Sequence, residues 1–307
     1  MNISSANKIL YIKLGKKGEY WSECRDKSII KLGYLSGRAD MLNLMKNKQW
    51  EKISEFWAKN SGTPTQFTNQ MRDFYEDDGT TLWITFEDEF LYYGFSDGGE
   101  LILDEGSDDS YRKMKDGWKR TDINGEDLRV NQLSGKLTKT ASYRQTICNL
   151  SEDVKKYLVR RLLCIKSESI ENAVLAKQNL ELSMQSLIQD LTWQDFELLV
   201  ELIFVNSGWR RISTTGGVQK TIDIGLENPI TGDMAFVQIK SSTNQSELED
   251  YTNKMNLSSY SRLFYVYHTP NGLMENKDAD VTLWNVSKIA QLVVSNGLTD
   301  WVIKRSS

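Results

Sequence analysis

The sequence has few of the residues on which several common kinds of site depend. His268 is the only histidine in 307 residues, which excludes metal sites built from several histidines and argues against a histidine-dependent phosphodiesterase. The three cysteines, Cys24, Cys148 and Cys164, are odd in number and unevenly spaced, so they predict neither a disulfide framework nor a zinc finger. Such cysteine usage is typical of proteins in a reducing cytoplasm.

Long apolar runs and a large excess of one charge are also missing. No segment approaches the roughly twenty apolar residues of a membrane span, and residues 1–8 lack the apolar core of a signal peptide. We therefore expect a soluble, cytoplasmic protein with no membrane partner. The formal net charge of −4 argues against indiscriminate coating of duplex DNA, because such binding depends on neutralising phosphates. Any nucleic-acid surface must be local.

The most informative stretch begins with an amphipathic helix. Apolar residues recur at helical spacing over residues 193–204, and Thr192 is available as the N-cap. Glu197 and Glu201 are four residues apart and are therefore expected on one side of that helix. A turn that needs the freedom of glycine is predicted at residues 214–217.

Two strand patterns follow, and they carry polar residues that suit one kind of chemistry. Residues 221–226 contain a single acid, Asp223, and residues 234–240 end in Gln238, Ile239 and Lys240. Hydrolysis of a phosphodiester needs a hard cation on oxygen ligands, an activated water and a nearby positive group. The Asp223 carboxylate and the neutral oxygens of Gln238 and Ile239 can bind the cation. Lys240 can orient or deprotonate the water, and either Glu197 or Glu201 can complete the ligand shell.

The order and spacing of these residues resemble a known family. Phe196-Glu197, Gly208-Trp209, Asp223-x-Gly225 and Val237-Gln238-x-Lys240 stand as in the Mrr-like branch of the PD-(D/E)XK nucleases, in which glutamine replaces the usual glutamate. The resemblance covers roughly residues 182–303. It implies a restriction-endonuclease-like mixed sheet flanked by helices, and an endodeoxyribonuclease that uses Mg²⁺, or Mn²⁺ in its place. It also implies catalytic roles for Asp223, Gln238, Lys240 and Glu197, with Asp223, Gln238 and Ile239 at the metal.

The rest of this half fits such a sheet. A helix is expected at residues 246–256, buried strands at 262–268 and 281–284, and a final helix at 284–296 with Gly297 as its stop.

The first half of the chain mixes strand and helix patterns. Strands are expected at 8–14, 29–34, 81–86, 90–95 and 100–103. One helix or two short ones are expected at 41–57, and another helix at 67–75. With 307 residues, the chain is long enough for two domains with separate cores. The first half predicts a compact β-barrel with added helices, so the overall class is α+β or α/β.

Several motifs of the first half resemble the PUA/EVE-type domains that precede some Mrr-like nucleases. They are Lys13-Leu14-Gly15, Trp21, residues 30–34, Asn69-Gln70-x-x-x-Phe74, Trp83 and Tyr92-Tyr93-Gly94. Such domains read a modified base by flipping it out of the duplex between aromatic rings. Trp21 and Trp83 are the preferred pair, with Tyr20 and Tyr92 beside them, and Lys16 and Lys17 are candidates for phosphate contacts. The alternative is that these rings are ordinary core residues and the lysines are solvated.

These patterns divide the chain into three parts. Residues 1–150 are expected to sense a modified base, residues 151–181 to form a helical connector, and residues 182–307 to form the nuclease domain. We expect a type IV, modification-dependent endonuclease that defends against phage and acts as a homodimer or higher oligomer. Two alternatives stay open: a nuclease gated by a small molecule or another signal, and an inactive nucleic-acid-binding module.

Overall fold

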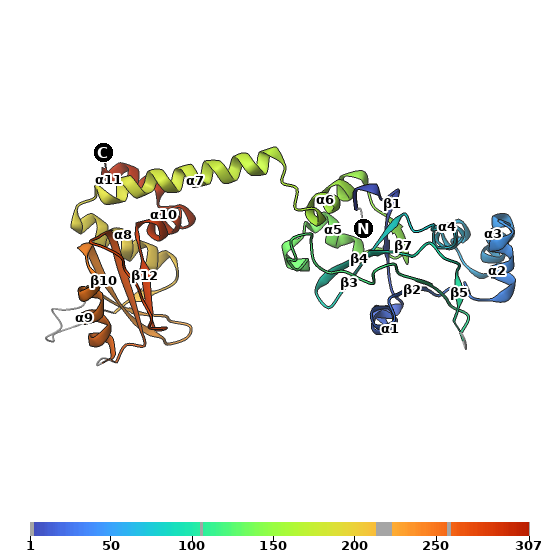
Figure 1. Ribbon diagram of the computed structural model, residues 1–307, viewed down its shortest axis with the longest axis horizontal. Helices are drawn as coiled ribbons and strands as arrows, with labels where there is room; N and C mark the ends of the chain where they lie inside the picture. The colour runs from blue at the N-terminus through green and yellow to red at the C-terminus, as the bar shows by residue number, and fades with distance from the viewer. Residues whose placement is uncertain (1–2, 105–106, 213–222, 257–258, 307) are drawn as a thin grey trace. The chain divides into compact units, whose positions relative to one another are not determined.

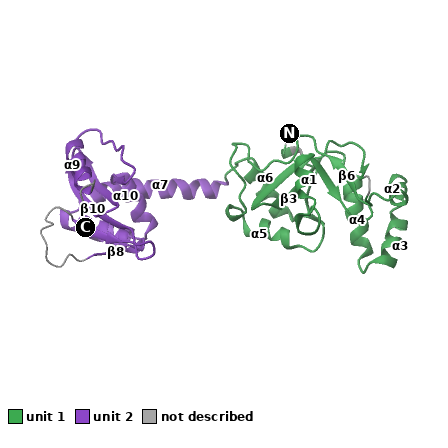
Figure 2. Cartoon of the chain, turned by 90° about the horizontal axis from the view of Figure 1, so that it is seen from below, with its two compact units in different colours: residues 1–166 green, residues 167–307 purple. Residues whose placement is uncertain are grey.

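The computed structural model describes residues 3–104, 107–212, 223–256 and 259–306. The chain forms two compact units, residues 1–166 and residues 167–307, shown in green and purple in Figure 2. The boundary falls inside the segment predicted as a connector. That segment contains helix α6 (Glu152–Leu162) in unit 1 and the start of helix α7 (Glu168–Gln189) in unit 2. The predicted turn at 214–217 and the start of the predicted strand 221–226 lie outside the described residues.

Unit 1 contains seven strands in its described part, and they form two separate sheets (Figure 1). The first sheet has the order β4-β3-β1-β7, from Phe90–Phe95, Thr81–Glu87, Lys8–Ile12 and Ile147–Asn149. The second has the order β2-β6-β5, from Ile29–Leu32, Ser110–Lys113 and Ile102–Leu103. The predicted strands are present, but no closed barrel forms in the part of unit 1 that the structure describes, so the expected barrel is not confirmed.

Short helices fill the rest of unit 1. The α-helices are α1 (Trp21–Asp26), α2 (Ala39–Lys46), α3 (Trp50–Asn60), α4 (Pro64–Tyr75), α5 (Gly135–Thr138) and α6. The 3-10 helices are η1 (Ile3–Ser5), η2 (Lys16–Gly18), η3 (Val130–Gln132) and η4 (Lys139–Ser142). Helices α2, α3 and α4 enclose a cluster of their own, centred on Met41, Met45, Ile53, Trp57 and Met71.

Unit 2 is built on one mixed sheet of five strands, in the order β12-β11-β10-β9-β8. Its strands are β8 (Arg210–Arg211), β9 (Ile224–Glu227), β10 (Met234–Thr243), β11 (Arg262–Pro270) and β12 (Val281–Trp284). Its helices are α7, α8 (Trp193–Asn206), α9 (Gln245–Asn256), α10 (Val286–Ser295) and α11 (Thr299–Ser306). Strands β10, β11 and β12 are parallel, whereas β9 runs antiparallel to β10. This mixed sheet with helices fits the restriction-endonuclease-like architecture expected from the sequence.

The two faces of this sheet are covered differently. Val237 and Ile239 of β10 pack with residues of α7, α8, α10 and α11, whereas Phe236 packs with Leu248 and Met255 of α9. Successive strand residues point to opposite faces, so this alternation places Gln238 and Lys240 on the same face as α9. In Figure 1, α9 accordingly lies apart from α8, α10 and α11.

Two expectations about composition also bear on the fold. All three cysteines are free, and Cys24 and Cys148 are buried. No helix in the described ranges is both long and apolar enough to cross a membrane.

Candidate active site

Pairing between strands β9 and β10 places Asp223 beside Gln238. Ile224 of β9 lies opposite Val237, and Asp223 precedes Ile224. The Oδ2 atom of Asp223 accepts hydrogen bonds from Gln238 Nε2 at 2.5 Å and from the Ile239 backbone N–H at 2.7 Å. Burial nevertheless raises the pKa of the Asp223 carboxyl above its usual range, against the opposing effects of these donors and of Lys240. The donors and Lys240 therefore do not fully offset the cost of burying this carboxylate, and a nearby cation would stabilise its charged form.

The glycine of the Asp-x-Gly motif has a packing reason. A Cβ atom on Gly225 would lie 2.8 Å from the hydroxyl oxygen of Tyr260, which is too close for ordinary contact. A larger residue at this position of β9 would have to displace the Tyr260 hydroxyl.

Helix α8 brings one of its two candidate acids toward Asp223. Thr192 caps the helix by accepting from the Asp195 backbone N–H at 3.2 Å. Burial and then the negative charge of Asp223 raise the pKa of Glu197, while Arg211 opposes the shift. Glu201 instead pairs with Arg211 at 2.7 Å. The charge effect of Asp223 on Glu197 and the ion pair of Glu201 thus favour Glu197 over Glu201 as the acid that shares a site with Asp223.

The side chain of Gln238 has a buried oxygen whose hydrogen-bonding capacity is not satisfied by the described residues. The residue is 3% exposed, and its buried Oε1 has no hydrogen-bond partner among the described residues. An unsatisfied buried acceptor costs about 1–3 kcal/mol, so it calls for a ligand or a bound water. A cation beside this amide oxygen would remove that cost.

The donor set fits a hard divalent cation. It consists of the carboxylates of Asp223 and Glu197, the amide oxygen of Gln238 and the carbonyl of Ile239, all oxygen ligands of the kind that Mg²⁺ and Mn²⁺ bind. Over the described ranges, no three His, Cys, Asp or Glu side chains are grouped so as to hold a metal ion. The fit therefore depends on the two neutral oxygens as well as on the two acids.

Lys240 lies on the same stretch of β10. Its charge lowers the pKa of Asp223, so it is within electrostatic reach of that carboxylate. Its Nζ atom lies 5.4 Å from the centroid of the Tyr251 ring on α9. An acid pair, a buried amide and a lysine therefore converge at one end of the β9–β10 hairpin.

Comparison with protein families points to the same part of the chain. Residues 188–266 match the Mrr_cat family, described as restriction endonuclease. This supports an Mrr-like nuclease catalytic domain, here called the Mrr-like core, and the match contains every candidate residue of the site. A comparison with curated proteins returned no match.

The Mrr-like core also brings in residues that the sequence did not single out. Arg211 pairs with Glu201 and acts on Glu197, and Tyr251 contacts Lys240. The helical spacing of α9 placed Tyr251 on a helix, but no local pattern connects it with a strand residue eleven positions earlier. Both contacts depend on how the sheet and its helices pack.

In unit 1, the four aromatic residues predicted for base recognition lie in or against one hydrophobic cluster. Trp21 and Tyr92 are brought together, with ring centroids 4.3 Å apart, and Trp21 Nε1 donates to Asp88 Oδ2 at 2.9 Å. Trp83 is 0% exposed, and its Nε1 donates to the buried Asp77 at 2.8 Å. Trp21 and Tyr92 are also buried, at 5% and 7% exposed. Their role in reading a base stays a prediction.

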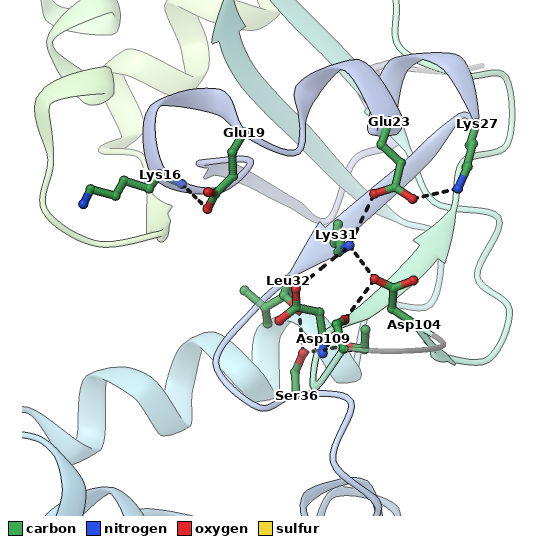
Figure 3. Close-up of polar contacts among 11 residues, drawn as sticks. Lys16, Glu19, Glu23, Lys27, Lys31, Leu32, Ser36, Asp104 and Asp109 are labelled. Atoms are coloured by element: carbon green, nitrogen blue, oxygen red, sulfur yellow. Dashed lines mark hydrogen bonds and ion pairs between the residues drawn. The ribbon is translucent and has the colours of Figure 1, made fainter.

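Figure 3 shows a compact ionic cluster around Lys31, with Lys16 lying to one side of it. Lys31 Nζ lies 4.8 Å from the Tyr20 ring centroid and pairs with Glu23 at 3.3 Å and with Asp104. Burial, followed by the effects of Asp109, raises the pKa of Tyr20 to about 12.

The two lysines predicted to contact phosphate lie near this cluster in the sequence. The Lys16 backbone N–H donates to Glu19 Oε1 at 2.9 Å, and the Lys16 side chain points away from the cluster in Figure 3. Lys16 and Lys17 are exposed, as a phosphate contact requires.

Proposed function

We propose that this chain is a modification-dependent DNA endonuclease of type IV restriction, in which unit 1 samples a modified base and the Mrr-like core hydrolyses the phosphodiester. Asp223, Gln238 and the Ile239 carbonyl would hold Mg²⁺, or Mn²⁺ in its place, with Glu197 completing the set. The bound cation would supply Lewis-acid polarisation of the phosphate and a more acidic water. Defence against phage with modified DNA is the biological role that this activity suits.

The protein's own groups have defined tasks in this proposal. The Ile239 backbone N–H and the Gln238 amide hold the Asp223 carboxylate in one orientation through its Oδ2 atom. Lys240 orients the attacking water and offsets negative charge that develops on the phosphate. Cleavage of both strands requires two such cores, so we propose that the enzyme acts as a homodimer or higher oligomer.

One observation carries the proposal: the buried Oε1 of Gln238, which has no hydrogen-bond partner in the part of the chain that the structure describes, lies beside Asp223, whose pKa is raised by burial. Both residues lie within the segment that matches the restriction endonuclease family. A purely structural hairpin would gain nothing from leaving this acceptor without a donor. Base reading by unit 1 is supported by its resemblance to PUA/EVE-type domains.

The test is cleavage of matched plasmids carrying cytosine, 5-methylcytosine, 5-hydroxymethylcytosine or its glucosylated form, with Mg²⁺ or Mn²⁺. Asp223→Ala removes the main ligand, and Glu227→Ala, at an exposed position of the same hairpin, is the matched control. We expect the wild type and the control to cut one modified substrate and Asp223→Ala to cut none.

Other outcomes would separate the rival functions. Equal cutting of all four plasmids would keep the nuclease and remove the base-reading role. DNA binding without cleavage in either metal would favour an inactive binding module, the reading consistent with glutamine at position 238. Cutting only after addition of a cell extract's small-molecule fraction would indicate a signal-gated nuclease.

A further inference from the structure

An aromatic ring, rather than a carboxylate, contacts the ammonium group of Lys240. Its Nζ lies 5.4 Å from the Tyr251 ring centroid, and within the described part of the chain no Asp or Glu oxygen lies within the 4.0 Å of an ion pair. The face of an aromatic ring carries partial negative charge and attracts cations. Lys254 uses the same ring, with its Nζ 4.2 Å from the centroid. Tyr251 thus brings two like charges together beside the proposed catalytic strand.

The position of Tyr251 is fixed by contacts between α9 and the sheet. Thr243, at the end of β10, donates to Glu247 Oε2 at 2.8 Å and lies 2.5 Å from the hydroxyl of Tyr265. Glu247 and Tyr251 are four residues apart and therefore share one side of α9. The Tyr251 ring packs on Tyr265, which is fully buried, at a centroid distance of 5.9 Å. The helix therefore presents this ring to β10 at a defined place.

We propose that Tyr251 is a positioning residue for Lys240 in DNA cleavage, an inference that rests on the proposed nuclease function. A lysine side chain on a strand has many rotamers, and contact with the ring restricts them to those that keep Nζ near Asp223. The face of an aromatic ring attracts a cation without accepting a conventional hydrogen bond from it. It therefore leaves the three N–H donors of Lys240 available for a water or a phosphate oxygen. A carboxylate partner would occupy those donors.

The test is single-turnover cleavage of the preferred plasmid by the full chain carrying Tyr251→Phe or Tyr251→Leu. Phenylalanine keeps the ring, so we expect a rate within about 2-fold of wild type, whereas leucine should slow cleavage about 5- to 10-fold. DNA affinity measured without divalent metal should not change in either variant. Leu248→Ala is the matched control, because it removes a buried contact of the same helix, 2% exposed, while keeping the Tyr251 ring itself. We expect it to lower the melting temperature while keeping the cleavage rate.

A double-mutant cycle distinguishes positioning from general support of the fold. In a Lys240→Ala background, Tyr251→Leu should have no further effect on the residual rate. Equal slowing by leucine in both backgrounds, or equal slowing by phenylalanine and leucine, would overturn the inference.

A measurement independent of activity keeps the inference testable if the wild type does not cut DNA. The chain is labelled with ¹³C at the lysine ε-carbon, and the Lys240 signal is assigned from its loss in Lys240→Arg. Contact with the ring predicts an upfield ring-current shift of the Lys240 ε-protons in wild type and Tyr251→Phe, and its loss in Tyr251→Leu. An unshifted Lys240 signal in the wild type would refute the contact, whereas a shifted signal without cleavage would refute only the nuclease function.

Discussion

Two groups of partly buried polar and charged residues in this chain are arranged in opposite ways. In unit 1, Lys31 is 7% exposed and pairs with Glu23 and Asp104, and Asp109 lies 4.0 Å from its ammonium group. In the Mrr-like core, Gln238 Oε1 is left without a donor among the described residues. Glu197 there faces the like charge of Asp223.

The pKa directions separate the two groups. Hydrogen bonds from Lys27 and Lys31 lower the pKa of Glu23, and Lys31 does the same for Asp104. Burial raises the pKa values of Asp223 and Glu197. When the pKa of an acid is lowered in the folded state, its ionisation stabilises the fold. When the pKa is raised, its ionisation destabilises the fold. The Lys31 cluster therefore stabilises the fold, whereas the charges of Asp223 and Glu197 are kept at a cost in stability, as is common at functional sites.

The largest expected effect follows from removing the charge of Asp223. Asp223→Asn keeps the shape of the side chain but loses the anionic ligand, so we expect cleavage to fall at least about 100-fold. Mg²⁺ should raise the melting temperature of the wild type but not of the variant, because only a bound ligand stabilises the folded state. Scanning fluorimetry in EDTA and in Mg²⁺ checks this. An unchanged Mg²⁺ response in the variant would mean that the cation binds elsewhere.

Breaking the Lys31 cluster should reduce stability rather than cleavage chemistry. Lys31→Met keeps the apolar stem of the side chain but leaves Asp104 and Asp109 without their cation and Glu23 with Lys27 in place of two lysines. We expect a loss of about 2–3 kcal/mol in the free energy of unfolding, reduced from the value for a fully buried pair because the acids are partly exposed. Urea unfolding measures it, and Asp104→Asn in the same chain should recover part of the loss. A loss below about 0.5 kcal/mol would contradict the structural role of the cluster.

The two groups should also respond to pH with opposite signs in EDTA. Glu23 and Asp104 have lowered folded pKa values, so their stabilisation is present above the usual values of 4.5 and 3.8 and is lost as pH falls. Asp223 and Glu197 have raised values, so the metal-free fold is favoured below their usual 3.8 and 4.5 and loses stability as pH rises through the raised values. Asp223→Asn should therefore stabilise the metal-free protein at neutral pH but not in acid. Melting temperatures of the wild type and the variant, measured from acidic to neutral pH, test this prediction. An equal stabilisation by Asp223→Asn at acidic and neutral pH would show that the charge of Asp223 is not the cause.

The smallest effect should come from the second acid of α8. Arg211, the partner of Glu201, is 52% exposed, so Glu201→Gln should change the free energy of unfolding by less than about 1 kcal/mol. Cleavage should stay within about 3-fold of wild type, whereas Glu197→Gln should slow it at least about 10-fold. Comparing the two variants at a series of Mg²⁺ concentrations separates ligand loss from a general effect on the helix. An equal loss of cleavage rate in Glu201→Gln and Glu197→Gln would mean that Glu201 is still a candidate metal ligand.

Much of unit 2 could be predicted because its signals are local. Residues 262–268 and 281–284 are apolar runs and do form strands β11 and β12, and the helices predicted at 246–256 and 284–296 form α9 and α10. The terminal helix α11 was not predicted. It is short, and only Val302 of it is buried, so its sequence carries little periodic signal.

The site and unit 1 depended more on contacts between distant residues. The spacing of Asp223, Gln238 and Lys240 placed them together because two neighbouring strands have a fixed period. It could not choose between Glu197 and Glu201, since the choice depends on Arg211. The sequence does not show which aromatic residues of unit 1 are buried in the core and which line a pocket. Trp83, for example, is buried because its indole N–H can donate to Asp77 inside the core. Closure of a barrel depends on pairing between strands, which residue patterns do not encode.

The antiparallel connection between β9 and β10 has a consequence for the order in which the protein assembles. Gln238 contacts an Asp223 only fifteen residues earlier in the chain, across a turn closed by the Asn228 N–H and the Asp233 carbonyl at 2.9 Å. Closing so short a loop costs little entropy, whereas the parallel partner β11 is reached only through helix α9. We expect the hairpin that carries Asp223 and Gln238 to form early in folding. Its charge would then be solvated until α8 docks, so the cost of burying it arises at that step.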